Sequence, residues 1–324
     1  MTFILGVDGG TSKTKALLAA PDGTIAGYGH AGGSNIYDGD PQRALENGLQ
    51  AAELAVTSAG ISPDQIATSV FSMSGADWPE DMLYFRAGAR ARSLGQQIVV
   101  VNDAMGGMRA GLPGPDAVGI VCGTGAGCAA RSHTGRQWHA GFWQQGGGAS
   151  ELSRAALQAI YRAELGADQE TALAGQILQR FGEKSVPALL HRQTALMHEP
   201  LPDIPLLASL VLDVAAAGDT VAQTIVRDQA RGLAETAMAA ARQVGIDGQP
   251  YDLVLAGSLF RHPSTILPDA IVKSMREFQQ QVTVLRSRHE PVVGALLLAL
   301  EEHGTTVNQP VISRIISTLP EGWY

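Results

Sequence analysis

The sequence predicts an α/β protein built from two copies of one unit, and three observations lead to this fold class. The chain has 324 residues, which suits two domains better than one. It opens with an apolar strand, a glycine-rich turn, a second strand, a polar turn and a third strand, and the same order returns from residue 117. Helix and strand segments follow both sets. Because such a repeat is hard to obtain by chance, we expect two similar halves that face each other across a cleft.

The elements of the first half follow from short apolar runs and the turn residues between them. Pro21-Asp22-Gly23 is typical of a turn, Asp40-Pro41 of an N-cap with the first helical position, and Gly60 and Gly95 of helix ends. We therefore expect strands at 3–7, 15–20, 24–28, 68–73 and 98–101, helices at 41–58 and 81–94, and shorter helical segments from 62 and from 104.

The second half repeats this order around a glycine-rich turn at 123–127. A polar turn at 133–135 follows, and then a long helical region that is broken near 200–205. We expect strands at 117–122, 128–132, 136–139, 251–256 and 282–286, and a helix at 291–300. The first domain is expected to span residues 1–113 together with the tail 304–324, and the second domain residues 114–303.

Composition and charge narrow the classes of function. With 23 basic against 31 acidic residues the formal net charge is −8, which argues against a nucleic-acid groove. No run approaches about 18 uninterrupted apolar residues, and the N-terminus lacks the basic segment of a secretory signal. Cys122 and Cys128 are too few for a disulfide framework in so long a chain and lack the neighbours of a zinc site. We expect a cytoplasmic protein that binds neither nucleic acid nor membranes.

The two glycine-rich corners carry more polar chemistry than a hairpin needs. The first contains Gly9, Gly10, Thr11 and Lys13, and the second is Gly123-Thr124-Gly125. Glycine lets backbone N–H groups approach an anion closely, and hydroxyls add donors, so each corner can hold phosphate oxygens. Two plain hairpins are the alternative. Neither the G-x4-G-K-[ST] loop nor a G-x-G-x-x-G turn between strand and helix is present, so other common phosphate loops do not fit.

Five short motifs span nearly the whole chain, in the order "GVDGGTSKTKALL" (6–18), "VVVNDAMGG" (99–107), "GIVCGTGAGCAAR" (119–131), "LVLAGSLF" (253–260) and "PVVGALLLAL" (291–300). This ordered set resembles the actin-like ATPase superfamily of sugar kinases, heat-shock 70 proteins and actin. The closer similarity is to the N-acetylglucosamine kinase branch, grouped with the BadF/BadG/BcrA/BcrD ATPases, because "GGSNIY" (32–37) and "SMSGAD" (72–77) resemble its amino-sugar contacts. The resemblance implies duplicated actin-like (ribonuclease H-like) domains with an interdomain cleft, and ATP and Mg²⁺ as cofactors.

The resemblance also implies roles for residues at the ends of strands. Asp8 is expected to hold Mg²⁺ through water, with a plain turn aspartate as the alternative. Asp103 follows a fully apolar strand, so its carboxylate is expected at the strand end where α/β sheets bind ligands, and it is expected to act as general base. Capping of the helix from Ala104 is its alternative role. The expected ATP-binding residues are Gly9, Gly10, Thr11, Lys13, Gly123, Thr124, Gly125, Gly257 and Ser258, the last two near the adenosine.

The sugar contacts are carried over from the same motifs, and they contain one departure from the family pattern. Relatives carry a Gly-Asp-Glu-Gly-Ser stretch after the second phosphate hairpin, but here it reads "QQGGGASELS" (144–153), with Gly147 and Gly148 in place of the acids. Glu151, in the first turn of a helix capped by Ser150, is expected to substitute for them. The expected sugar-binding residues are Asn35, Ser74, Gly75, Asn102, Asp103, Gly147 and Glu151. Gly294 and Ala295 resemble the small residues of a hinge helix.

The sequence therefore predicts an ATP-dependent kinase whose partners are ATP and a hexosamine, phosphorylated at the 6-hydroxyl of N-acetylglucosamine or glucosamine. An ATP-driven activator of a radical dehydratase is the alternative from the same family grouping. Such activators share an iron–sulfur cluster between two subunits through cysteines downstream of the phosphate loops, whereas Cys122 and Cys128 flank the second loop itself. A catalytically silent sugar sensor is a third possibility. The sugar, the hydroxyl and a homodimeric state are left open.

Overall fold

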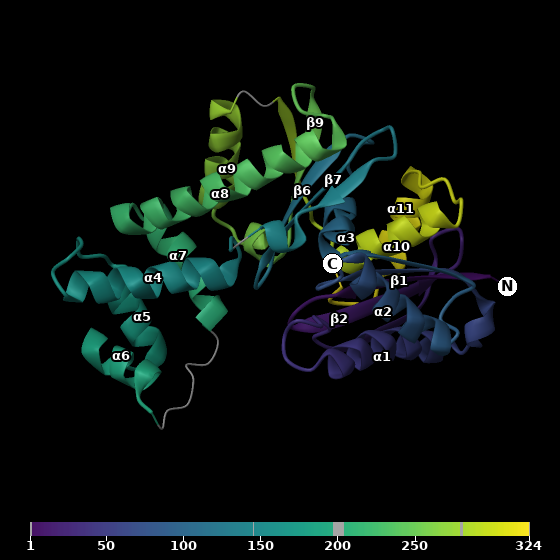
Figure 1. Ribbon diagram of the computed structural model, residues 1–324, viewed down its shortest axis with the longest axis horizontal. Helices are drawn as coiled ribbons and strands as arrows, with labels where there is room; N and C mark the ends of the chain where they lie inside the picture. The colour runs from purple at the N-terminus through teal and green to yellow at the C-terminus, as the bar shows by residue number, and fades with distance from the viewer. Residues whose placement is uncertain (1, 145, 197–203, 279–280, 324) are drawn as a thin grey trace.

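The computed structural model describes residues 2–144, 146–196, 204–278 and 281–323, and within them the strands form two five-stranded sheets (Figure 1). The first sheet, in the order β3-β2-β1-β4-β5, contains β1 (Phe3–Gly9), β2 (Lys13–Ala19), β3 (Ile25–Gly32), β4 (Ile66–Met73) and β5 (Gln97–Asn102). The second, in the order β10-β9-β6-β7-β8, contains β6 (Ala117–Cys122), β7 (Ala126–Arg131), β8 (Gln137–His139), β9 (Tyr251–Ala256) and β10 (Val282–Arg286).

Both sheets are connected in the same way. Their first three strands form an antiparallel meander, and the last two strands run parallel to the first. In parallel strands the carboxyl ends lie at one edge of the sheet, so β1, β4 and β5 deliver their following residues to one place, as do β6 and β9. The shared order confirms the expected duplication.

The first sheet is covered on one face by α1 (Pro41–Ala59) and α2 (Pro79–Ala91), which share a core with β1 and β4. Helix α1 has the predicted limits for the predicted reasons. The Asp40 side chain accepts a hydrogen bond from the backbone N–H of Gln42 (3.0 Å), Pro41 takes the first helical position, and Gly60 ends the helix in the left-handed region (φ 65°).

Two helices cross where the halves meet. Helix α3 (Asp103–Ala110) packs against the second sheet, and α10 (Pro291–Glu302) packs against the first sheet beside Ile4 and Val70. The crossing has no room for a side chain, because a Cβ on Gly294 would lie 1.9 Å from the carbonyl oxygen of Gly106. Helix α10 thus packs on the first sheet, although it lies within the range 114–303 expected for the second domain, since sequence periodicity does not say which sheet an apolar helix covers.

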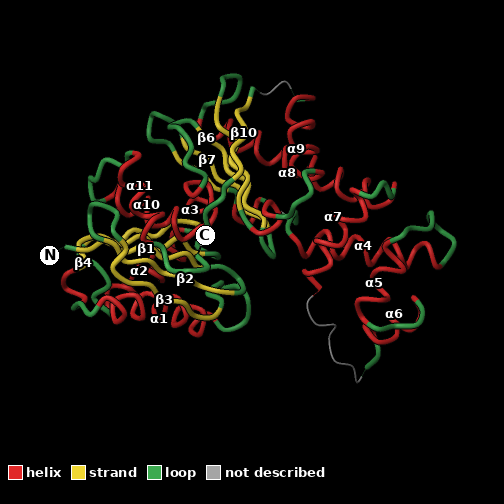
Figure 2. Tube along the Cα trace, turned by 180° about the vertical axis from the view of Figure 1, so that it is seen from behind, coloured by secondary structure: helices red, strands yellow, loops and turns green. Residues whose placement is uncertain are grey.

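The remaining helices of the second half form one core with its sheet. They are α4 (Ala149–Glu164), α5 (Leu173–Phe181), α6 (Val186–Thr194), α7 (Leu207–Ala216), α8 (Thr220–Val244) and α9 (Ile266–Glu277). Helices α4–α6 project away from the first half (Figures 1 and 2). The break expected near 200–205 falls largely outside the described residues. Among the described residues no single helix is long and apolar enough to cross a membrane, and α7 with α8 passes that test only as a pair bent by 115°.

Short 3-10 helices and the tail complete the chain. The 3-10 helices are η1 (Pro63–Gln65), η2 (Gly141–Trp143), η3 (Ile204–Leu206) and η4 (Ser258–Arg261). The tail helix α11 (Gln309–Thr318) returns to the first sheet, where Ile315 is buried with residues of β1, β2 and α10.

Candidate active site

A cavity of about 520 Å³ lies between the halves and collects most of the residues expected to form the site. Its lining comes from the turn after β1, the segments that follow β4 and β5, the turn between β6 and β7, and the segment after β9. The expected residues that line it are Asp8, Gly10, Thr11, Lys13, Asn35, Ser74, Gly75, Asn102, Asp103, Gly123, Thr124, Gly125, Gly257 and Ser258. Gly9, Gly147 and Glu151 lie elsewhere.

The two glycine corners meet across this cavity. The hydroxyl oxygens of Ser12, in the first corner, and Thr124, in the second, are 3.2 Å apart. A Cβ on Gly123 or Gly125 would contact nothing within 4 Å, so these glycines are not required by protein packing and leave their backbone open to a ligand.

The second corner is held by the start of α4. The N–H groups of Ala149 and Ser150 donate to the carbonyl oxygens of Gly123 (2.9 Å) and Thr124 (3.0 Å). At Gly148 an added Cβ would lie 2.3 Å from the backbone carbon of Gly125, so position 148 admits only glycine. Gly148, and not Ser150 as expected, caps α4. This contact gives a physical reason for glycine at position 148.

Gly9 is buried below the first corner. Its carbonyl oxygen accepts a hydrogen bond from the N–H of Ser74 (2.7 Å), and an added Cβ would lie 2.2 Å from the hydroxyl oxygen of Ser34. Gly9 thus connects β1 to the segment after β4 by a hydrogen bond, and this contact helps to position the first glycine corner.

Acidic and basic groups gather at the end of β1. The pKa of Asp8 is raised to about 8, mainly by burial and further by the negative charges of Asp103 and Glu290. Glu290, at the start of α10, accepts from Lys13 (Nζ to Oε1, 3.3 Å) and from Lys15. Burial alone would raise the pKa of Glu290, but its contacts with Lys15 and Lys13 outweigh burial and hold that pKa below its usual value. The Glu290 carboxylate in the cavity wall therefore pairs with two lysines, Lys13 and Lys15.

Asp103 stands at the first turn of α3, directly after β5. Capping of α3 falls to Asn102, whose Oδ1 accepts from the N–H of Ala104 (3.0 Å), so Asp103 is not needed as the cap. Burial and the charge of Asp77 raise the pKa of Asp103 to about 6. Asn102 also donates from Nδ2 to Oδ1 of Asp77 (2.8 Å), which places a second carboxylate of the first half beside Asp103.

Asn35, Ser74 and Gly75 form the wall opposite the second corner. Asn35 accepts from the N–H of Tyr37 (3.0 Å) through Oδ1, and at Gly75, with φ 82°, an added Cβ would lie 2.8 Å from that oxygen. These backbone constraints fix the Asn35 amide in the cavity. On the other side Gly257 (φ 100°) turns the chain after β9, where an added Cβ would meet the carbonyl oxygen of Cys122 at 2.3 Å.

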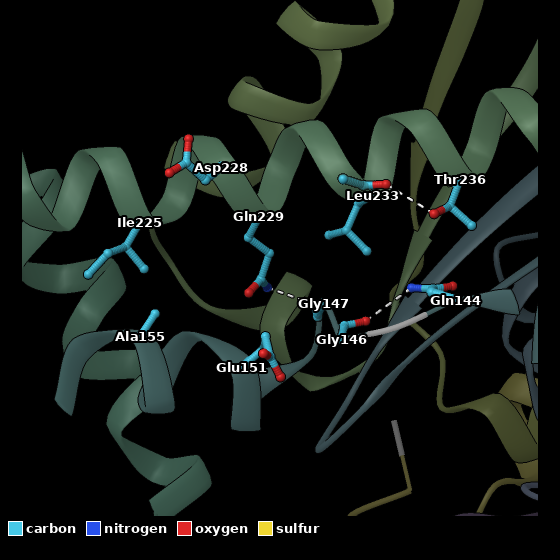
Figure 3. Close-up of a pocket in the computed structure, with 11 residues that line it drawn as sticks. Gln144, Gly146, Gly147, Glu151, Ala155, Ile225, Asp228, Gln229, Leu233 and Thr236 are labelled. Atoms are coloured by element: carbon cyan, nitrogen blue, oxygen red, sulfur yellow. Dashed lines mark hydrogen bonds between the residues drawn. The ribbon is translucent and has the colours of Figure 1, made fainter. Parts of the chain in front are cut away.

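Gly147 and Glu151, both expected at the sugar, line a separate cavity of about 300 Å³ between α4 and α8 (Figure 3). Gln229 of α8 donates to the carbonyl oxygen of Gly147 (2.6 Å), and Glu151 forms an ion pair with Arg154 (2.6 Å). The structure therefore does not bring these two residues together with Asp103.

Sequence reasoning did not single out several residues of the main cavity. They are Lys15, Tyr37, Asp77, Phe142, Arg261 and Glu290. Asp77 closes the "SMSGAD" motif and Lys15 follows Lys13 on the same face of β2, so a local signal existed for both. Glu290 and Phe142 carried no such signal, because only the packing of distant segments brings them to the cavity.

Two α/β halves of one topology, with paired glycine corners on a shared cleft, define an ATPase of the actin-like class. The chain belongs to the BadF/BadG/BcrA/BcrD ATPase family, whose model matches residues 5–299.

Named relatives match almost the full length of the chain. It is 24% identical over 310 residues to the N-acetylmuramic acid/N-acetylglucosamine kinase of Clostridium acetobutylicum (93% of this chain, 99% of the relative). It is 22% identical over 314 residues to the N-acetyl-D-glucosamine kinase of Dictyostelium discoideum (92% and 98%). A crystal structure from Chromobacterium violaceum, solved as a candidate N-acetylglucosamine kinase, has the same fold with a TM-score of 0.67, 24% identity and coverage of 92% and 99%.

Proposed function

We propose that this protein is an ATP-dependent hexosamine kinase that transfers the γ-phosphoryl group to the 6-hydroxyl of N-acetylglucosamine or glucosamine. The observation that carries the proposal is the position of Asp103, in one cavity with both glycine corners. The names of the two curated relatives support the substrate class.

In the proposed reaction the sugar hydroxyl attacks the γ-phosphorus. A new O–P bond forms, the bond from the γ-phosphorus to the bridging oxygen breaks, ADP leaves, and the hydroxyl proton passes to the Asp103 carboxylate. With a pKa of about 6 this carboxylate is mainly ionised at neutral pH and can accept that proton. The corners position the phosphates, which is most of what phosphoryl transfer asks of a protein.

The charges at the end of β1 suit a Mg·ATP complex. Mg²⁺ prefers oxygen ligands and commonly takes one or two carboxylates together with phosphate oxygens and water. Half-buried Asp8 lies near Asp103 and Glu290, and burial and these two carboxylates disfavour its ionised form, which a bound divalent cation would favour. When bound, Mg²⁺ would neutralise phosphate charge. The phosphates would also compete with Glu290 for Lys13.

The burial of the cysteines favours the kinase over the dehydratase activator. Cys122 and Cys128 are no more than 1% exposed within the core of the second half, and burial raises both thiol pKa values, that of Cys128 to about 12. Thiols in this position do not reach a cluster shared with another subunit.

A substrate panel tests the proposal. N-acetylglucosamine, glucosamine and glucose, which lacks the amino group, are offered with Mg·ATP, and ADP release is followed by a coupled assay. We expect the highest kcat/KM with an amino sugar, and ADP release by Asp103→Asn that is lower by about 10²–10⁴. Faster turnover of glucose than of either amino sugar, or ADP release independent of sugar, would contradict the proposal.

A further inference from the structure

A smaller cavity of about 240 Å³ adjoins the main one, and aromatic side chains dominate its lining. Aromatic residues make up only 5% of the sequence, yet Trp78, Trp138 and Trp143, three of its four tryptophans, line this cavity together with Phe142. We call these four residues and the space between them the aromatic pocket. Packing against the core accounts for Trp138, so the other three rings need another explanation.

Three of the four rings of the aromatic pocket face water, and the fourth, Trp138, packs partly against the core of the second half. Trp143 is 79% exposed, Phe142 49% and Trp78 42%. Scattered exposed apolar side chains are ordinary, but a contiguous exposed patch is typical of a binding surface. The free energy that water contact costs these rings is recovered when a ligand covers them.

The rings are held in place from both halves. Phe142, in η2 of the second half, lies edge to face with Tyr37 of the first half, with ring centroids 4.8 Å apart and an interplanar angle of 85°. It also stacks with Trp78 of the first half at 6.3 Å and 22°. Tyr37 is fixed in turn, because its hydroxyl donates to Oδ1 of Asp81 (2.9 Å). A ligand would therefore meet a surface that is already arranged.

Polar groups alternate with the rings in a way that suits a sugar. Asp77, Gln137 and His139 line the same pocket, and His139 Nε2 lies 3.3 Å from the backbone oxygen of Asp77. A pyranose ring has an apolar face of C–H groups and a rim of hydroxyls, so it needs flat aromatic surface and hydrogen-bonding groups at its edge. Pockets for drug-sized ligands occupy about 300–1,000 Å³, so this one suits a single ring.

The aromatic pocket continues the main cavity. Asp77, Gly141 and Phe142 line both spaces, and Asp77 accepts from Asn102, the neighbour of the expected general base. Because the two spaces share these residues, a ligand in the main cavity lies next to the aromatic pocket. A further part of the same sugar is therefore the occupant that this neighbourhood favours.

We propose that the aromatic pocket is a second sugar subsite, so that the substrate class includes hexosamines that carry another pyranose ring. The inference rests on the proposed kinase function. The ring beside Asp103 reacts as described above, gaining the phosphoryl group from ATP and giving its hydroxyl proton to Asp103. The second ring stacks on Trp143 and Trp78 and undergoes no chemistry.

Steady-state kinetics with one ring and with two rings test this subsite. N-acetylglucosamine and its β-1,4-linked disaccharide are compared for the wild type, Trp143→Ala and Trp78→Ala. Tyr84→Ala is the matched control, because Tyr84 is another exposed ring (38%) and lines neither cavity. An aromatic contact contributes about 0.5–1.5 kcal/mol, and each 1.4 kcal/mol is about tenfold in affinity. Each tryptophan variant should therefore lower kcat/KM for the disaccharide, relative to that for the monosaccharide, by about two- to tenfold.

The possible outcomes separate the subsite from the kinase. Phosphorylation of the disaccharide, with the selective loss in both tryptophan variants and none in Tyr84→Ala, supports the subsite. If N-acetylglucosamine is phosphorylated but the disaccharide neither reacts nor competes, the subsite is refuted and the kinase stands. Phosphorylation of neither sugar, nor of any hexosamine, refutes the kinase itself and the subsite with it. Equal losses on both substrates refute the subsite, as does a dimer that Trp143→Ala dissociates without any change in sugar selectivity.

Discussion

Replacing Asp103 with asparagine removes the proton acceptor of the cleft and keeps the shape of the side chain. Asn102 caps α3 through the N–H of Ala104, so the helix keeps its start in the variant. General-base catalysis contributes about 10²–10⁴ to rate, which corresponds to about 3–5 kcal/mol of activation free energy. We expect kcat of Asp103→Asn to fall by that factor, while the affinity for ATP changes little because both glycine corners are intact.

The pH dependence sharpens this prediction. Burial and Asp77 raise the pKa of Asp103 to about 6. Protonation removes the base, so its contribution to wild-type kcat/KM should decline below about pH 6, by about tenfold per pH unit. The asparagine variant should lack this acid limb, because it has no proton to gain at that position.

A coupled ADP-release assay across pH 5 to 8 measures both effects, with calorimetry for ATP binding. Asp38→Asn is the control, since it neutralises an exposed carboxylate of the same half. A kcat for Asp103→Asn within about tenfold of wild type, below the usual range for a general base, would refute the assignment. Persistence of the acid limb in the variant would refute the cause given for it.

Three further predictions concern packing, closure and the cysteines. Gly294→Ala should destabilise the fold by about 1–3 kcal/mol, because the new Cβ would overlap the carbonyl oxygen of Gly106. Gly175→Ala, in a helix with open space around that position, should leave stability unchanged or raise it by up to about 1 kcal/mol; denaturant unfolding that ranks the two variants the other way round would contradict the packing argument. Without ligand the halves are expected to open from the arrangement described here, in which the hydroxyls of Ser12 and Thr124 are 3.2 Å apart, and sugar with an ATP analogue should draw them together; a scattering profile that stays unchanged while calorimetry shows both ligands bound would rule this out. The protein purified without oxygen should contain no stoichiometric iron, because Cys122 and Cys128 are buried; brown protein with acid-labile sulfide would favour the activator instead.

The strand ends and the corners could be predicted because their signals are local. The limits of α1 are set by Asp40, Pro41 and Gly60, which lie within one segment of the chain. Asp103 could be predicted as a site residue because it is a polar residue directly after an apolar strand. The missing acids after the second corner were visible in the sequence as well. The constraint on position 148 was not, because it comes from the contact with the backbone of Gly125, more than twenty residues earlier.

The sequence by itself determined the duplicated strand order, the two glycine corners and the carboxylates at the ends of β1 and β5, since each depends on the chemistry of a few consecutive residues. Only the tertiary structure decided which groups share the cleft. Lys15 and Glu290 pair across 275 positions, and α10 joins the first sheet although it follows the second in sequence. The aromatic pocket takes Trp78 from one half and Trp143 from the other. Such contacts depend on how the two sheets pack against α3 and α10, and residue periodicity does not predict that packing.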